Sequence, residues 1–90
     1  MDRTALARAI YDRTHLTGTF TLRSGAVSNE YFDKYRFESD PALLREIAEA
    51  LVPLVPSGID GLAGLELGGV PIATMLSQVT GLPVQCGGRG

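Results

Sequence analysis

The sequence of 90 residues predicts an α/β fold that is incomplete, and two observations support this. The first is the order of elements in the second half: an apolar strand, a Gly-Gly turn, a helix, a glycine and a further strand, as in a βαβ unit. The second is that fifteen of the 18 charged residues lie within positions 1–50, whereas nine of the 11 glycines lie at or beyond Gly58. Apolar parallel strands need helices on both faces, so we expect the fold to require more chain to cover them.

Composition excludes several classes of protein. The net charge of −2 argues against a strongly basic nucleic-acid binder or membrane-surface protein. The single cysteine, Cys86, excludes an intrachain disulfide framework and a zinc site built on paired cysteines, and we expect it to be inert. The sequence has no apolar run near the roughly 18 residues of a membrane span and no apolar signal-peptide core. We therefore expect a cytoplasmic protein.

The first 38 residues predict one helix followed by extended chain. Apolar spacing indicates a helix over residues 2–14, with Asp2 or Thr4 as its N-cap. Alternation of polar and apolar side chains then predicts strands at 19–22 and 31–37.

The second predicted helix has the clearest signals. Asp40 is a good N-cap, and Pro41 suits the first helical position because its missing N–H costs nothing there. Pro53 ends the pattern. The apolar face that follows the i, i+3, i+4 rule comprises Leu43, Leu44, Ile47, Ala48, Leu51 and Val52.

The βαβ unit begins with a buried strand at 62–67. Gly68-Gly69 breaks this strand, and a third helix starts near Pro71. Gly81 stands where a C-terminal cap belongs, and the second strand begins at Leu82.

The Gly68-Gly69 turn has the geometry of an anion site. Backbone N–H groups and the positive end of the helix dipole would point the same way, which suits a phosphate or pyrophosphate. Neither a P-loop Lys-Ser/Thr nor the G-x-G-x-x-G spacing is present, so a plain strand–helix connection is the competing interpretation. We interpret Glu66, just before the turn, as a carboxylate that accepts from loop N–H groups or emerges from the sheet edge.

A second cluster of cations, hydroxyls and aromatics lies between Arg23 and Lys34. A guanidinium with small hydroxyls suits an anionic ligand, and aromatics suit a flat ring. The alternative is that the aromatics from Tyr31 to Tyr35 are half-buried strand residues and that the charges between them are solvated. We interpret His15 as a helix-terminus residue rather than a catalyst.

Two segments resemble the orotate phosphoribosyltransferases, which belong to the type I phosphoribosyltransferase family. The resemblance covers about residues 5–84 without an obvious gap. The first motif is specific to the family, and the second is shared with related phosphoribosyltransferases. These motifs are Phe20-Thr21-Leu22-Arg23-Ser24-Gly25 with Ser28 and Tyr31-Phe32-Asp33, and Leu62-Ala63-Gly64-Leu65-Glu66-Leu67-Gly68-Gly69-Val70-Pro71 with Thr80-Gly81-Leu82-Pro83-Val84.

The resemblance implies a Rossmann-like parallel sheet with a small N-terminal hood over the site, and a homodimer as the working form. It implies synthesis of orotidine 5′-monophosphate and pyrophosphate from orotate and phosphoribosyl pyrophosphate with Mg²⁺, in pyrimidine (UMP) biosynthesis. It places no metal ligand and no catalytic residue within this chain. The substrate-binding residues that it implies are Arg23, Ser24, Tyr31 and Phe32, and its phosphate-binding turn is Leu67, Gly68 and Gly69.

The sequence departs from the family pattern in three places. Some members carry a Tyr-Lys pair in the turn where this chain has Leu67 and Gly68, so that side-chain cation is missing. After Val84, the family continues into an Arg-Lys pair and a mobile loop, whereas this chain has an off-pattern tail at 85–90. We interpret this tail as the result of a frameshift or a truncated gene. The motif of two acidic residues and a Thr/Gly-rich loop that cradles the 5′-phosphate is also absent from the sequence.

We therefore expect an N-terminal fragment of an orotate phosphoribosyltransferase that is inactive alone. Its expected parts are a hood at 1–38, the start of the core at 39–84 and the off-pattern tail at 85–90. Two alternatives stay open. One is a module that binds a nucleotide or phosphate without turnover, and the other is a non-catalytic piece that docks on a full-length copy.

Overall fold

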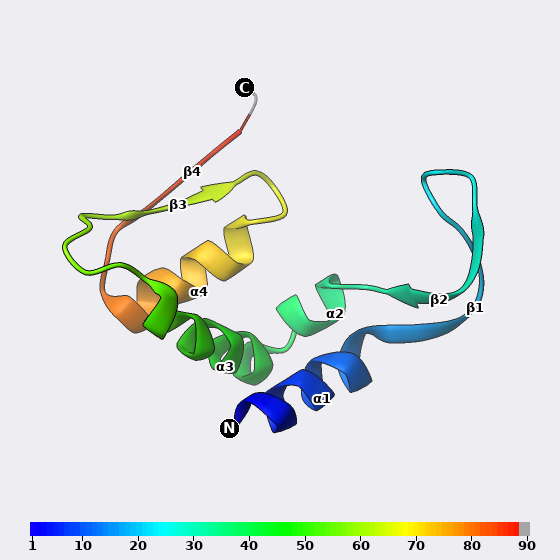
Figure 1. The fold of residues 1–90 in the computed structure, drawn as a ribbon. Helices are drawn as coiled ribbons and strands as arrows, with labels where there is room; N and C mark the ends of the chain where they lie inside the picture. Colours follow the sequence, from blue (N-terminus) through cyan, green and yellow to red (C-terminus); the bar gives the residue numbers. More distant parts are fainter. Residues whose placement is uncertain (89–90) are drawn as a thin grey trace.

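The computed structural model describes residues 1–88 and confirms the mixed helix–strand architecture (Figure 1). In chain order the elements are α1 (Arg3–Thr14), β1 (His15–Thr21), β2 (Val27–Phe32), α2 (Tyr35–Glu38), α3 (Pro41–Leu51), the 3-10 turn η1 (Val52–Leu54), β3 (Leu62–Leu65), α4 (Val70–Thr80) and β4 (Val84–Gly87).

Helix α1 begins and ends through local backbone chemistry. The Asp2 carboxylate caps its start by accepting from the N–H of Ala5 at 2.8 Å. His15 is the C-cap residue, and its backbone N–H donates to the carbonyl oxygen of Tyr11. The predicted helix and the interpretation of His15 as its terminus are therefore confirmed.

The hairpin of β1 and β2 is antiparallel, and its strands begin at His15 and Val27, before the predicted starts at 19 and 31. The prediction of a strand over 31–37 is wrong beyond Phe32, because Tyr35–Glu38 forms the short helix α2. The cause is local: the Asp33 carboxylate accepts from the N–H of Tyr35 at 3.1 Å and turns the chain into a helical bend.

Helix α3 lies at the centre of the molecule and contacts α1, α2 and α4. The Asp40 carboxylate caps it by accepting from the N–H of Leu43 at 3.2 Å, and Pro41 opens its first turn, as predicted. Its apolar face buries Leu43, Leu44 and Ala48, and Ala48 is fully buried. Burial of each leucine contributes about 2 kcal/mol, so this face supplies much of the core.

The β3–α4–β4 unit has the predicted βαβ form, with β3 and β4 parallel. Strand β3 lies unusually close to α4, because a Cβ on Gly64 would stand 2.7 Å from the Cβ of Ala73. Gly81 ends α4 in the left-handed conformation (φ 76°), which glycine adopts without cost. Strand β4 runs on through Gly87, so the first residues of the expected tail pair with β3. The last two, at 89–90, lie outside the described residues.

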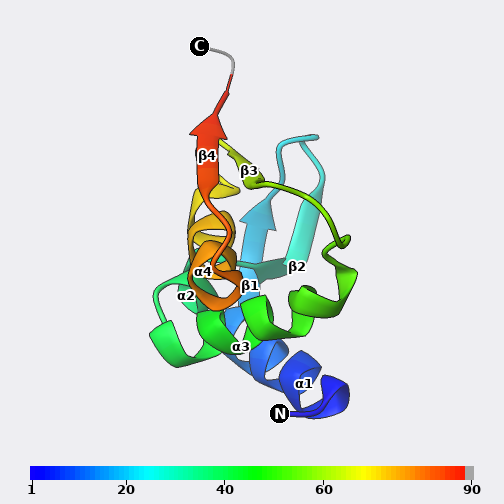
Figure 2. The same cartoon turned by 90° about the vertical axis from the view of Figure 1, so that its left-hand side faces the viewer.

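The molecule is open rather than compact. Its radius of gyration is 15.2 Å, whereas a compact chain of this length has about 12 Å. Figures 1 and 2 show α1 and α3 at one end and β3 and β4 at the other, and Figure 1 shows the hairpin standing apart. Helix α4 covers one face of the small sheet, and the other face leaves Leu65 76% exposed. None of the helices in the described part of the chain has the length and hydropathy of a membrane span.

Candidate functional site

The turn between β3 and α4 presents open backbone donors at a helix N-terminus. Gly69, the N-cap residue of α4, provides no side chain to cap the helix. Its own N–H donates inside the turn to the carbonyl of Leu65 at 2.8 Å. Within residues 1–88, the N–H groups of Leu67 and Gly68 have no acceptor. Unpaired N–H groups beside a helix N-terminus favour an anion. The phosphate-binding interpretation of Leu67, Gly68 and Gly69 stays a prediction, and the donors open to an anion are those of Leu67 and Gly68.

Glycine is required in this turn by close backbone approach. A Cβ on Gly69 would lie 3.0 Å from the backbone nitrogen and 3.1 Å from the carbonyl oxygen of Leu65.

Glu66 comes directly after β3, and its peptide bond to Leu67 is cis. The Glu66 side chain is exposed at the end of β3, and its N–H donates to the carbonyl of Gly87 at 3.0 Å. Glu66 therefore emerges at the sheet edge, which is one of the two interpretations made from the sequence.

Arg23 and Ser24 form the tip of the β1–β2 hairpin. The N–H of Leu22 donates to the carbonyl of Ala26 at 2.8 Å and closes the tip. Ser24 Oγ accepts a long hydrogen bond, 3.4 Å, from the N–H of Ala26. The Arg23 side chain is exposed and makes no ion pair within residues 1–88. Its guanidinium is therefore available for an anionic ligand.

Tyr31 and Phe32 are consecutive residues of β2, so their side chains leave opposite faces of the hairpin. The Tyr31 ring lies 5.6 Å from that of Phe20, and the Phe32 ring lies 5.3 Å from that of His15. His15 is also stacked on Tyr11, with ring centroids 4.5 Å apart. Because Tyr31 and Phe32 remain 46% and 55% exposed, both retain ring surface for a ligand.

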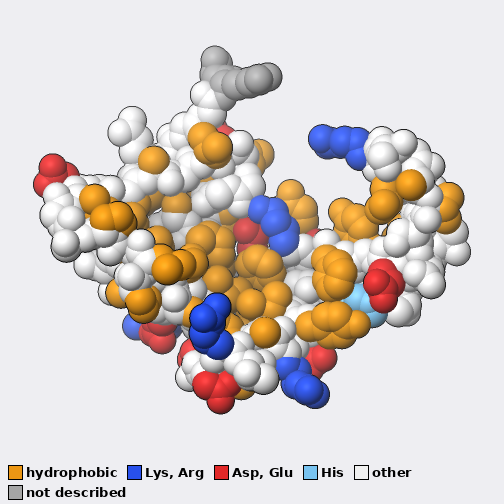
Figure 3. Space-filling view, in the orientation of Figure 1, with side chains coloured by type: hydrophobic (Ala, Val, Ile, Leu, Met, Phe, Trp, Pro, Cys, Tyr) orange, Lys and Arg blue, Asp and Glu red, His pale blue; other side chains and the backbone are white. Residues whose placement is uncertain are grey.

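The hairpin and the turn lie on opposite sides of a hollow that the space-filling view shows (Figure 3). No hydrogen bond or ion pair joins the Arg23 tip to the turn in the described part of the chain. A hydrogen bond to the turn comes instead from Lys34, at the other end of β2, whose Nζ donates to the carbonyl oxygen of Gly68 at 2.6 Å. Sequence reasoning missed this contact, because 34 positions separate the two residues and no local pattern signals it.

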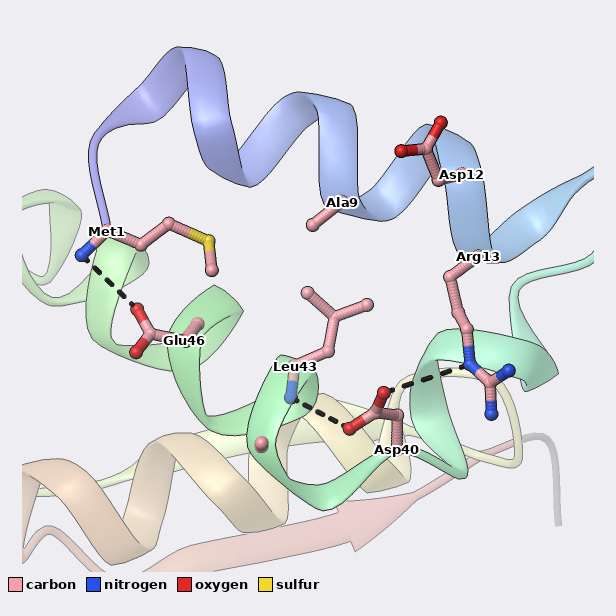
Figure 4. A pocket seen from close by; sticks show the side chains of 8 residues that line it. Met1, Ala9, Asp12, Arg13, Asp40, Leu43 and Glu46 are labelled. Carbon is pink, nitrogen blue, oxygen red and sulfur yellow. Dashed lines mark hydrogen bonds and ion pairs between the residues drawn. The ribbon is translucent and has the colours of Figure 1, made fainter.

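A pocket of about 410 Å³ between α1 and α3 is a different feature (Figure 4). Ala9 and Leu43 lie at its middle. Ion pairs stand at its two ends: the Met1 amine lies 3.7 Å from Glu46, and Arg13 lies 3.8 Å from Asp40. These four charges already pair with one another, and Asp12 is the one charged lining residue without an ion pair in residues 1–88, so the pocket offers no cluster of free polar groups.

Comparisons with known proteins agree with the resemblance seen in the sequence. No family model matches the chain. The orotate phosphoribosyltransferase of Nocardioides sp. strain JS614 is 65% identical over 68 residues, which are 76% of this chain and 38% of that protein. The orotate phosphoribosyltransferase of Aeropyrum pernix superposes with a TM-score of 0.74 at 28% identity, covering 94% of this chain and 50% of that one.

A further solved structure is that of Mycobacterium tuberculosis orotate phosphoribosyltransferase in complex with inorganic phosphate. It superposes with a TM-score of 0.78 at 26% identity, covering 93% of this chain and 51% of that one. The chain thus spans between about two fifths and one half of the length of these relatives. In sequence and in fold, the chain corresponds to the N-terminal part of the proteins of the orotate phosphoribosyltransferase family.

Proposed function

We propose that this chain supplies the orotate-binding hood and the first phosphate-binding turn of an orotate phosphoribosyltransferase. The complete enzyme would join orotate to phosphoribosyl pyrophosphate and release orotidine 5′-monophosphate and pyrophosphate. The observation that carries the proposal is the placement of an open Gly-Gly turn across a hollow from the Arg23 hairpin, in a chain 65% identical to such an enzyme over 68 residues.

Each part has a role that its chemistry suits. The free N–H groups of Leu67 and Gly68, at the positive end of α4, would donate hydrogen bonds to oxygens of the diphosphate leaving group. The exposed Arg23 guanidinium would bind an oxyanion of a substrate through a charge-assisted hydrogen bond. Tyr31 and Phe32 would contact the flat orotate ring. Together these groups hold the two reactants and stabilise charge on the departing diphosphate.

The remaining parts of the reaction need residues that this chain does not supply. The sequence contains no acidic pair followed by a Thr/Gly-rich loop for the 5′-phosphate. Within residues 1–88 no three His, Cys, Asp or Glu side chains lie close enough together to hold a metal ion. The Mg²⁺ that the resemblance implies would be held by substrate diphosphate and by residues elsewhere. We also place the complete enzyme in the cytoplasm as a homodimer.

The test of this proposal compares the 90-residue chain with a spliced protein. In the spliced protein, residues 1–84 replace the matching N-terminal part of the Nocardioides relative. We expect no loss of orotate absorbance with the chain alone, because the 5′-phosphate cradle is missing. The turnover rate of the spliced protein should lie within about tenfold of that of the relative, because the relative's own part supplies the missing cradle and loop. Turnover by the chain alone, or a folded but inert spliced protein, would contradict the proposal; the second result would favour a binding module.

Arg23→Ala in the spliced protein should lower kcat/KM by about ten- to a hundredfold, because a hydrogen bond to a charged group contributes about 1.5–3 kcal/mol. Arg8→Ala is the matched control, since Arg8 is also an exposed arginine without an ion pair in residues 1–88. Its kcat/KM should stay within about twofold of the parent. Steady-state assays with each substrate varied in turn measure both, and equal kinetics for the two variants would mean that Arg23 binds no substrate.

A further inference from the structure

Lys34 makes a hydrogen bond unlike that of any other side chain in the described residues. Its Nζ donates to Gly68 O at 2.6 Å and so connects the end of the hood to the turn before α4. Every other side-chain hydrogen bond within residues 1–88 joins positions no more than five apart. The contact is close: a Cβ on Gly68 would stand 3.0 Å from the same Nζ. Lys34 is therefore the hydrogen-bonding side chain that fixes the turn relative to the hood.

The carboxylate of Glu38 keeps the Lys34 ammonium beside the turn. It lies one helical turn after Lys34, and its Oε2 is 3.6 Å from Lys34 Nζ. The Glu38 side chain is only 6% exposed, and neither of its carboxylate oxygens accepts a hydrogen bond within the described chain. A buried carboxylate without hydrogen bonds is costly, and the nearby ammonium offsets that cost. The carboxylate thus holds the ammonium beside Gly68.

This contact orients the turn. The carbonyl of Gly68 points at Lys34, and the N–H on the other side of the same peptide, that of Gly69, donates to Leu65. Both ends of this peptide are engaged, so its plane is fixed. The negative end of the Gly68 carbonyl is also directed at a cation, away from any anion that the neighbouring N–H groups would receive. The turn itself carries no side-chain cation, since Leu67 and Gly68 occupy its centre.

We propose that Lys34 is a positioning residue for the diphosphate: held by Glu38, it fixes the phosphate-binding turn through the Gly68 carbonyl and couples that turn to the hood. The proposal rests on the proposed function for the identity of the anion. It does not require Lys34 to touch the substrate.

The test uses the spliced protein and its Lys34→Met variant. Amide hydrogen exchange at Gly69 and Val70 should become about tenfold faster in the variant, because the turn loses a hydrogen bond to a charged group. The KM for phosphoribosyl pyrophosphate should rise about tenfold, while the KM for orotate stays within about twofold. Arg45→Met is the matched control, since it removes another i, i+4 ion pair, Arg45–Glu49 at 3.0 Å, from the exposed side of α3. It should change none of these readouts.

A second variant separates positioning from general loss of stability. Lys34→Met leaves the Glu38 carboxylate buried without a partner, whereas the double variant Lys34→Met with Glu38→Gln removes that charge. Exchange at Ala48, in the core of α3, should match the parent in the double variant, while exchange at the turn and the KM for phosphoribosyl pyrophosphate stay raised. Parent-like turn exchange and KM in the double variant would overturn the proposal. A spliced parent without turnover would count against the proposed function, yet turn exchange would still decide the role of Lys34.

Discussion

The 90-residue chain prepared alone is expected to bind 1-anilinonaphthalene-8-sulfonate with a several-fold rise in fluorescence and to self-associate. The physical reason is the uncovered apolar surface of the βαβ unit. Leu65 and Leu67 are 76% and 81% exposed, and both edges of the β3–β4 pair are open within residues 1–88. Open strand edges and contiguous apolar surface favour association. Dye fluorescence and sedimentation velocity measure the two effects.

The spliced protein is the control for this experiment, because its added strands and helices would cover the same surface. It should show little dye fluorescence and a discrete oligomeric state. A sharp two-state unfolding transition of a monomeric 90-residue chain, with native near-UV circular dichroism, would contradict the prediction. Such a result would mean that the five buried apolar residues, together with the partly buried ones, suffice for a stable domain.

Gly64→Ala in the spliced protein is expected to lower the free energy of unfolding by about 2 kcal/mol. The added Cβ would meet the Cβ of Ala73 at 2.7 Å and the carbonyl oxygen of Gly69 at 3.0 Å. Neither neighbour is the flexible end of a side chain, so β3 and α4 must separate. The melting temperature should fall by about 2–4 °C for each kcal/mol, which differential scanning calorimetry measures.

A double-mutant cycle with Ala73→Gly tests the cause of this loss. Ala73→Gly alone should cost about 1 kcal/mol, because glycine is unfavourable inside a helix. If the contact between the two Cβ atoms causes the loss, the double variant should lose less stability than the sum of the single variants. Strict additivity would mean that the distance between β3 and α4 is not limited by Gly64.

Local chemistry made most of the helices predictable. The Asp2 and Asp40 caps, Pro41 in the first turn of α3 and Gly81 in the left-handed conformation all act within a few residues, and the structure confirms each one. The prediction failed at 33–37, where alternation of side chains suggested a strand. There the Asp33 carboxylate bends the backbone into α2, a short-range effect that a period-two pattern does not register.

The candidate site, too, was predicted only in part from the sequence. The hairpin residues and the Gly-Gly turn were found from the sequence, because each is a continuous motif. The Lys34–Gly68 contact was not found, since it joins positions 34 residues apart and depends on how α2 and α4 pack against α3.

By itself, the sequence determined the order of elements, their caps, the βαβ connection and the likeness to orotate phosphoribosyltransferases. These follow from near-neighbour chemistry and continuous motifs. Only the tertiary structure decided that the hairpin and the turn stand across one hollow, that β3 needs Gly64 beside α4, and that Lys34 and Glu38 join hood to turn. The reason is physical: such contacts arise from packing between distant segments, and the residue types that make them carry no local signal of their partner.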